Sequence, residues 1–230
     1  GFGTRIYGKA DYGSDFEKLL SCYVESGIPL IVAMKNAEIG HALLAIGHVD
    51  VDEAGINALL PNVFSNSKLK ENAAKKNMVI FDYDTIIKEF IFIDDNHPVY
   101  QKALLSKPAA HYTKNWQTCE ITHFIVPLYT KIYLEAREAK NYILEYLING
   151  PNPLEDYSNV FLRMSLTSNR SFKDEVKKNG SISDELKGYI METNMPKFVW
   201  VAELSTKELF KKGDINGIIV LDATETNIYY

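Results

Sequence analysis

Three stretches of the sequence decide the fold: GIPLIVAM at residues 27–34, GHALLAIGH at residues 40–48 and FIFIDDN at residues 90–96. The first two are short apolar runs and the third is aromatic and β-branched, which is typical of strands. The second run carries His41 near its start, and the third ends in carboxylates. A histidine on one strand and a carboxylate at the end of another can form a catalytic pair. A hydrogen-bonded histidine at a strand end is the structural alternative for His41.

Two neighbouring carboxylates, Asp94 and Asp95, are candidates for the partner of His41. Side chains that follow one another on a strand point to opposite faces, so only one of the two is expected to face His41. The run Asp-Asp-Asn-His-Pro is also good turn chemistry by itself, and a simple turn is the alternative.

Length and composition restrict the class of protein. The chain has 230 residues, of which 46% are apolar and 24% are charged, an ordinary globular composition for one large domain or two small ones. The net charge is −5 and no block of Lys and Arg occurs, which disfavours nucleic-acid binding. No apolar run reaches about 18 residues, so no membrane span is expected. Cytoplasmic and exported locations both stay open.

Apolar spacing predicts a mixed α+β fold. The clearest helices are expected over residues 15–26 and 129–148, the second stopped by the Gly and Pro residues of 150–153. Residues 50–77 are interpreted as a surface excursion, with a short helix within it as an alternative, and residues 98–116 as irregular. The other predicted elements are strands over 28–34, 42–49, 78–83, 90–93, 118–127, 160–166, 198–204 and 215–222, and short helices over 171–178 and 183–191.

The two cysteines, Cys22 and Cys119, are expected to be inert. Cys22 lies within a predicted helix and lacks the helix N-terminus or neighbouring cation that activates a thiol. Cys119 belongs to a strand-like run and is expected in the core. One disulfide is arithmetically possible, but two cysteines make no disulfide framework.

No metal site and no cofactor are expected. The acidic residues after His48, and His97 with Asp94, match no strong ligand spacing. A metal-assisted hydrolase or transferase that uses His41, Asp94 and His97 is the alternative from another class.

Taken together, residues 25–32 (ESGIPLIV), residues 40–42 (GHA), Gly47 and residues 92–96 (FIDDN) resemble papain-like cysteine peptidases of the bacteriocin-processing, C39-like type. In that superfamily the catalytic residues occur in the order Cys, His, Asp or Asn. A helix that ends in G-I-P, a strand, G-H-A and a strand that ends in Asp form the second half of the pattern. The resemblance covers about residues 16–100.

The resemblance implies a papain-like fold with a largely antiparallel sheet, and a bacterial thiol hydrolase that cleaves a peptide or peptide-like substrate. His41 would be the base, and Asp94 or Asp95 its orienting partner. The nucleophile of the family sits at the start of a helix that would precede Gly1. Cys22 belongs to a later helix, so this role is not transferred to it.

Two consequences for domain organisation and activity follow. Residues 1–118 are expected to form a papain-like His/Asp half-domain, and residues 119–230 an unassigned α+β region packed on it or a small second subdomain. A degenerate relative that no longer cleaves anything, and acts as a binding or regulatory scaffold, is the alternative function.

Overall fold

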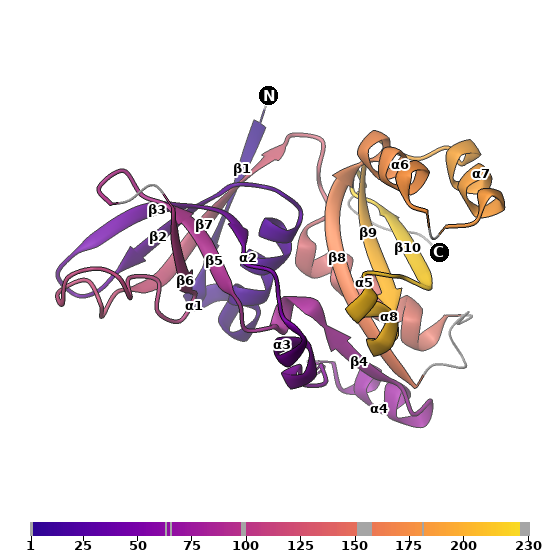
Figure 1. The fold of residues 1–230 in the computed structure, drawn as a ribbon, viewed down its shortest axis with the longest axis horizontal. Coiled ribbons are helices and arrows are strands. Elements are labelled where there is room, and N and C mark those ends of the chain that lie inside the picture. The colour runs from indigo at the N-terminus through magenta and orange to yellow at the C-terminus, as the bar shows by residue number, and fades with distance from the viewer. Residues whose placement is uncertain are drawn as a thin grey trace. The chain divides into compact units, whose positions relative to one another are not determined.

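The computed structural model separates the chain into two compact units (Figure 1). The first consists of Gly1–Leu59 and Asp84–Thr130, and the second of Leu60–Tyr83 and Lys131–Tyr230. The boundary expected after residue 118 falls inside the first unit. The structure describes residues 2–62, 64, 66–97, 100–150, 158–180 and 182–225.

The first unit is built on a six-stranded sheet with the strand order β1-β7-β2-β3-β5-β6, in which every neighbouring pair is antiparallel. This confirms the prediction of a largely antiparallel sheet in a mixed α+β chain. Its elements are β1 (Phe2–Gly8), α1 (Lys9–Tyr12), the 3₁₀ turn η1 (Gly13–Asp15), α2 (Phe16–Glu25), β2 (Leu30–Lys35), β3 (Gly40–His48), α3 (Glu53–Ala58), β5 (Glu89–Ile93), β6 (Gln101–Leu104) and β7 (Glu120–Tyr129).

Aromatic side chains pack α2 against one face of this sheet. Tyr7 of β1 stacks on Phe124 of β7, with ring centroids 4.7 Å apart. Phe16 and Tyr23 of α2 contact the same Phe124 ring at 5.2 and 6.5 Å. All four side chains are buried, and aromatic pairs of this kind each contribute roughly 0.5–1.5 kcal/mol beyond their burial.

The G-I-P sequence after α2 ends the helix and begins the next strand. Gly27 has a φ of 69°, in the left-handed region that favours glycine. The N–H of Gly27 donates to the carbonyl of Val24 at 2.9 Å, and the N–H of Ile28 donates to that of Tyr23 at 3.2 Å. This pair of bonds is a Schellman motif, and Pro29 directly after it cannot continue the helix. The chain therefore turns sharply into β2.

The second unit has a four-stranded sheet in the order β10-β9-β8-β4, in which β4 and β8 are parallel and the other pairs antiparallel. Every residue of the central strand β9 except Glu203 is buried, and Trp200 on it donates its indole N–H to the carbonyl of Leu134 at 3.0 Å. The elements of this unit are β4 (Val79–Asp82), α4 (Ser67–Lys75), α5 (Ala136–Asn149), β8 (Asn159–Ser168), α6 (Asn169–Lys178), α7 (Asp184–Glu192), β9 (Phe198–Ser205), α8 (Lys207–Lys212) and β10 (Gly217–Asp222). A further 3₁₀ turn, η2 (Tyr83–Thr85), spans the change of unit.

The helix expected from residue 129 begins only at Ala136, so this part of the prediction is wrong. Tyr129 instead ends β7 and pairs with Phe2 of β1. The region expected to be irregular contains β6, which pairs with β5. Within the described residues, no helix combines the length and hydropathy that a membrane crossing requires.

Candidate functional site

The strand register brings His41 and the carboxylates after β5 to the same place. Leu44 of β3 pairs with Ile93, the last residue of β5. Because the two strands are antiparallel, the residues that follow β5 lie beside the beginning of β3. His41 also stands opposite Met34, a buried residue of β2, and paired residues of an antiparallel ladder share a face. The imidazole therefore lies on the covered side of the sheet.

His41 contacts both candidate carboxylates, but in different ways. Its Nε2 lies 2.9 Å from Oδ1 of Asp94, a hydrogen bond, and 3.8 Å from Oδ1 of Asp95. The Asp94 side chain has no exposed surface, whereas that of Asp95 is 86% exposed. Alternation along a strand does not separate the two residues because β5 ends at Ile93. The structure thus brings the three predicted site residues together, with Asp94 as the buried partner.

Every oxygen of the Asp94 carboxylate has a donor. Oδ1 also accepts the backbone N–H of Asn96 at 2.8 Å, and Oδ2 accepts the hydroxyl of Tyr112. The bond to Asn96 is the local turn chemistry that the Asp-Asp-Asn run favours. The turn and the contact with His41 therefore exist in one structure, where the sequence presented them as alternatives.

These contacts fix the charge of Asp94. Burial alone would raise its pKa, but the hydrogen bonds from Tyr112, the Asn96 N–H and His41 lower the pKa from 3.8 to about 2. Burial, reinforced by the bond to the carboxylate, raises the pKa of Tyr112, so its hydroxyl remains a donor. At neutral pH Asp94 is therefore an ionised carboxylate, which can accept the Nε2–H of His41.

The second ring nitrogen of His41, Nδ1, has no hydrogen-bond partner in the described part of the chain. The imidazole is partly open, with 19% of its side chain exposed. Trp116 contacts it edge-on, with ring centroids 5.9 Å apart and planes at 74°. A histidine held at one nitrogen and open at the other can accept and return a proton.

The two cysteines do not complete a catalytic set. Both Cys22 and Cys119 are buried and outside any disulfide, and His41 makes no hydrogen bond to a thiol among the described residues. Burial raises the pKa of the Cys119 thiol, which opposes formation of the nucleophilic thiolate.

The structure does not bring together His41, Asp94 and His97, the residues expected for a metal-assisted enzyme. His41, Asp94 and Asp95 each offer one ligand atom within 4.8 Å of the others, the one such group among the described residues. His97 is not part of it, and its ring packs on Tyr112 at 4.1 Å. Both oxygens of Asp94 already accept protein donors. The geometry is that of a hydrogen-bonded pair.

A second histidine pair lies at the other end of β3. Nε2 of His48 is 2.6 Å from Oε2 of Glu25, whose side chain is 2% exposed. Its Nδ1 is 2.9 Å from the backbone oxygen of Val49. Both ring nitrogens of His48 are therefore engaged. From the sequence His48 is only a weak candidate for a metal ligand, and nothing in its spacing to Glu25 indicates this contact.

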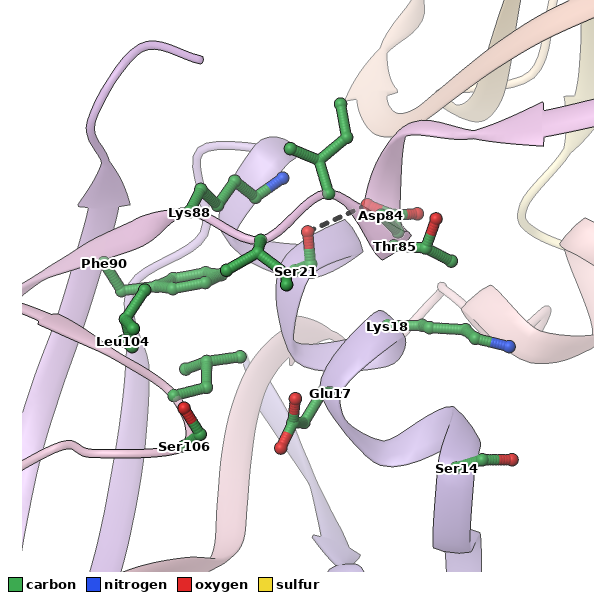
Figure 2. Close-up of a pocket in the computed structure, with 13 residues that line it drawn as sticks. Ser14, Glu17, Lys18, Ser21, Asp84, Thr85, Lys88, Phe90, Leu104 and Ser106 are labelled. Carbon is green, nitrogen blue, oxygen red and sulfur yellow. Dashed lines mark hydrogen bonds between the residues drawn. The ribbon is translucent and has the colours of Figure 1, made fainter. Parts of the chain in front are cut away.

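The first unit also contains a cavity of about 310 Å³ between α2, the start of β5 and the end of β6 (Figure 2). In it the Ser21 hydroxyl donates to Oδ1 of the buried Asp84 at 3.1 Å, and Phe90 and Leu104 form an apolar wall. Phe90 and Asp94 are four positions apart along the chain, roughly 13 Å for extended backbone. Neither His41 nor Asp94 is among the residues that line the cavity.

Tyr112 and Trp116 are the site residues that sequence reasoning missed. Both belong to the turns between β6 and β7, a region without hydrophobic periodicity that was expected to be irregular. Two aromatic residues in an otherwise polar, turn-rich stretch were the available signal, and it named no partner.

Comparison with known proteins adds no relative: no family model, no curated protein and no solved structure matches the chain.

Proposed function

We propose that His41 and Asp94 are the base and the orienting partner of a papain-like thiol hydrolase that cleaves peptide or amide bonds. One observation carries this proposal. Nε2 of His41 is hydrogen-bonded to a buried, ionised carboxylate, while Nδ1 has no partner among the described residues and the ring is partly exposed. By the resemblance, the nucleophile would be a cysteine other than Cys22 and Cys119, upstream of the His41 segment in the order Cys, His, Asp.

In this mechanism Asp94 accepts the Nε2–H and so selects the tautomer with a bare Nδ1. Nδ1 takes the thiol proton, and the thiolate attacks the scissile carbonyl carbon. The imidazolium then gives its proton to the leaving amine as the C–N bond breaks, which leaves a thioester. His41 next removes a proton from water, the hydroxide attacks the thioester, and the thiol recovers its proton. Asp94 stabilises the imidazolium in both steps without being protonated.

The decisive experiment measures alkylation of the natural protein, with whatever residues precede Gly1, by iodoacetamide between pH 5 and 9. The proposal predicts one thiol that reacts faster than free cysteine at neutral pH and loses this advantage in His41→Gln. His48→Gln is the matched control, since it removes a second carboxylate-bonded imidazole from the same strand. Equal rates in the wild type and His41→Gln would refute the proposal.

A non-catalytic scaffold is the second candidate, and the burial of both described thiols favours it. In this case the His41–Asp94 bond only joins β3 to the turn after β5. His41→Ala would then leave binding of a peptide partner intact, and no thiol would react faster than free cysteine. Peptide binding lost in His41→Ala, together with a fast thiol in the wild type, would exclude the scaffold.

A further inference from the structure

We propose that Tyr112 is a positioning residue that fixes the plane of the Asp94 carboxylate and thereby the direction of the His41 ring. The inference rests on the proposed function, because it concerns the same site. It is carried by the contacts of the Tyr112 hydroxyl and by the way in which the surrounding turns hold the Tyr112 side chain.

The carboxylate requires such a residue. Rotation of an Asp carboxyl group about its terminal bond is soft, so a single bond to Oδ1 does not fix its plane. His41 and the Asn96 N–H both use Oδ1. The Tyr112 hydroxyl is the donor to Oδ2, which lies on a side chain without exposed surface. Without it, a buried anionic oxygen would lack a partner and the carboxyl group could rotate away from Nε2.

The Tyr112 side chain is itself held firmly enough to act as a reference. It is 5% exposed, and its ring packs against His97 at 4.1 Å and Trp116 at 6.0 Å. Its backbone N–H donates to Ala109 at 3.1 Å, and its carbonyl accepts the side-chain amide of Gln117 at 3.1 Å. Backbone and ring are thus both constrained while the hydroxyl reaches Asp94.

The same segment touches the histidine directly. Trp116, four residues after Tyr112, contacts the His41 ring edge-on. Its backbone N–H donates to the carbonyl of Thr113 at 2.9 Å within the connecting turn. One segment between β6 and β7 therefore holds the carboxylate through Tyr112 and the imidazole through Trp116. The pair is oriented from a part of the chain that carries neither of its members.

Tyr112→Phe tests the inference because it removes the hydroxyl and keeps the ring contacts. Tyr23→Phe is the matched control: it removes another buried hydroxyl of the first unit, which is bonded to Tyr7 at 2.7 Å. The ¹⁵N resonances of the His41 ring report which nitrogen carries the proton. We expect them to approach each other in Tyr112→Phe, as the Nε2–H tautomer loses its preference, and to stay unchanged in Tyr23→Phe.

Hydrolysis by the natural protein gives the second readout. We expect kcat to fall about 10- to 100-fold in Tyr112→Phe with KM within about twofold, the range that misorientation of a reacting group produces. Wild-type ¹⁵N resonances and kcat in Tyr112→Phe would overturn the inference. If the wild type hydrolyses nothing, the proposed function fails, and the ¹⁵N resonances alone still decide whether Tyr112 orients His41.

A measurement on the wild type tests the inference even if Tyr112→Phe fails to fold. In the unmodified protein the Tyr112 hydroxyl proton should exchange slowly and appear downfield, since it is buried against a carboxylate. It should vanish as Asp94 is protonated in acid. Failure to find this proton in the folded wild type would overturn the inference without any variant.

Discussion

Two histidines at opposite ends of β3 show what separates a candidate catalytic imidazole from a structural one. His41 and His48 are each bonded through Nε2 to the carboxylate of a buried side chain, Asp94 and Glu25 respectively. They differ at Nδ1, which faces the Val49 carbonyl oxygen in His48 and has no partner within the described residues in His41. A histidine–carboxylate contact alone therefore says little about catalysis, because the second nitrogen decides whether a proton can be exchanged with a substrate.

Replacing each carboxylate with its amide tests most directly whether the two histidine–carboxylate pairs differ in role. Asp94→Asn should lower kcat of the natural protein by about 10⁴-fold, because the amide can donate to Nε2 and so favours the wrong tautomer. Glu25→Gln should leave kcat within about threefold. The check is hydrolysis of a fluorogenic peptide library at pH 7. Comparable losses in the two variants would mean that the pairs do not differ in role.

The two histidine–carboxylate pairs should, in contrast, contribute similarly to the free energy of unfolding. Glu25→Ala and Asp94→Ala should each lower the free energy of unfolding by about 3 kcal/mol, since both leave buried donors without their charged partner. Urea unfolding followed by circular dichroism measures this. A variant that unfolds like the wild type would show that its pair is too solvated to matter for the fold.

Acid should affect the His41 pair in a defined window. The pKa of Asp94 is lowered in the folded state to about 2, so its contribution is complete above its unfolded value of 3.8 and is lost as the pH falls toward 2. The shift corresponds to roughly 2 kcal/mol. The stability difference between the wild type and Asp94→Asn should therefore shrink as the pH falls below about 4. A difference independent of pH would contradict the lowered pKa.

The smallest effect is expected from metal ions. Because both oxygens of Asp94 accept protein donors, added Zn²⁺ or Mg²⁺ should change the melting temperature by less than about 1 °C. Asp95→Asn is the control, since it removes the exposed carboxylate of the cluster. A rise in melting temperature that this variant abolishes would reassign the cluster as a cation site.

Sequence patterns predicted the parts of this site that depend on local rules. The apolar runs located β2, β3 and β5, and the G-I-P run marked the end of α2, where Gly27 adopts the left-handed conformation. No strand order or register was predicted. His41 was paired with Asp94 or Asp95 from the family resemblance, and the register of β3 on β5 accounts for their proximity.

Contacts between distant residues were not predictable. Tyr112 reaches Asp94 across 18 positions through non-repetitive turns, and Glu25 reaches His48 from the end of a helix. Neither contact has a period or spacing that a single sequence displays. The continuation of β7 to Tyr129 was hidden for another reason: the apolar residues after it fit a helical pattern, but pairing with β1 decides the conformation.

The division of the chain has a consequence for the order in which the protein folds. All strands of the first sheet are available once β7 is complete at Tyr129, but β4 has by then been made without its partner. Val79 pairs in parallel with Asn159, 80 positions later along the chain. A parallel pairing this distant closes slowly, so an emerging chain carries an unpaired apolar strand after every strand of the first sheet has been made. Destabilising substitutions in β8 should therefore first increase aggregation during synthesis, before they lower the stability of the folded state.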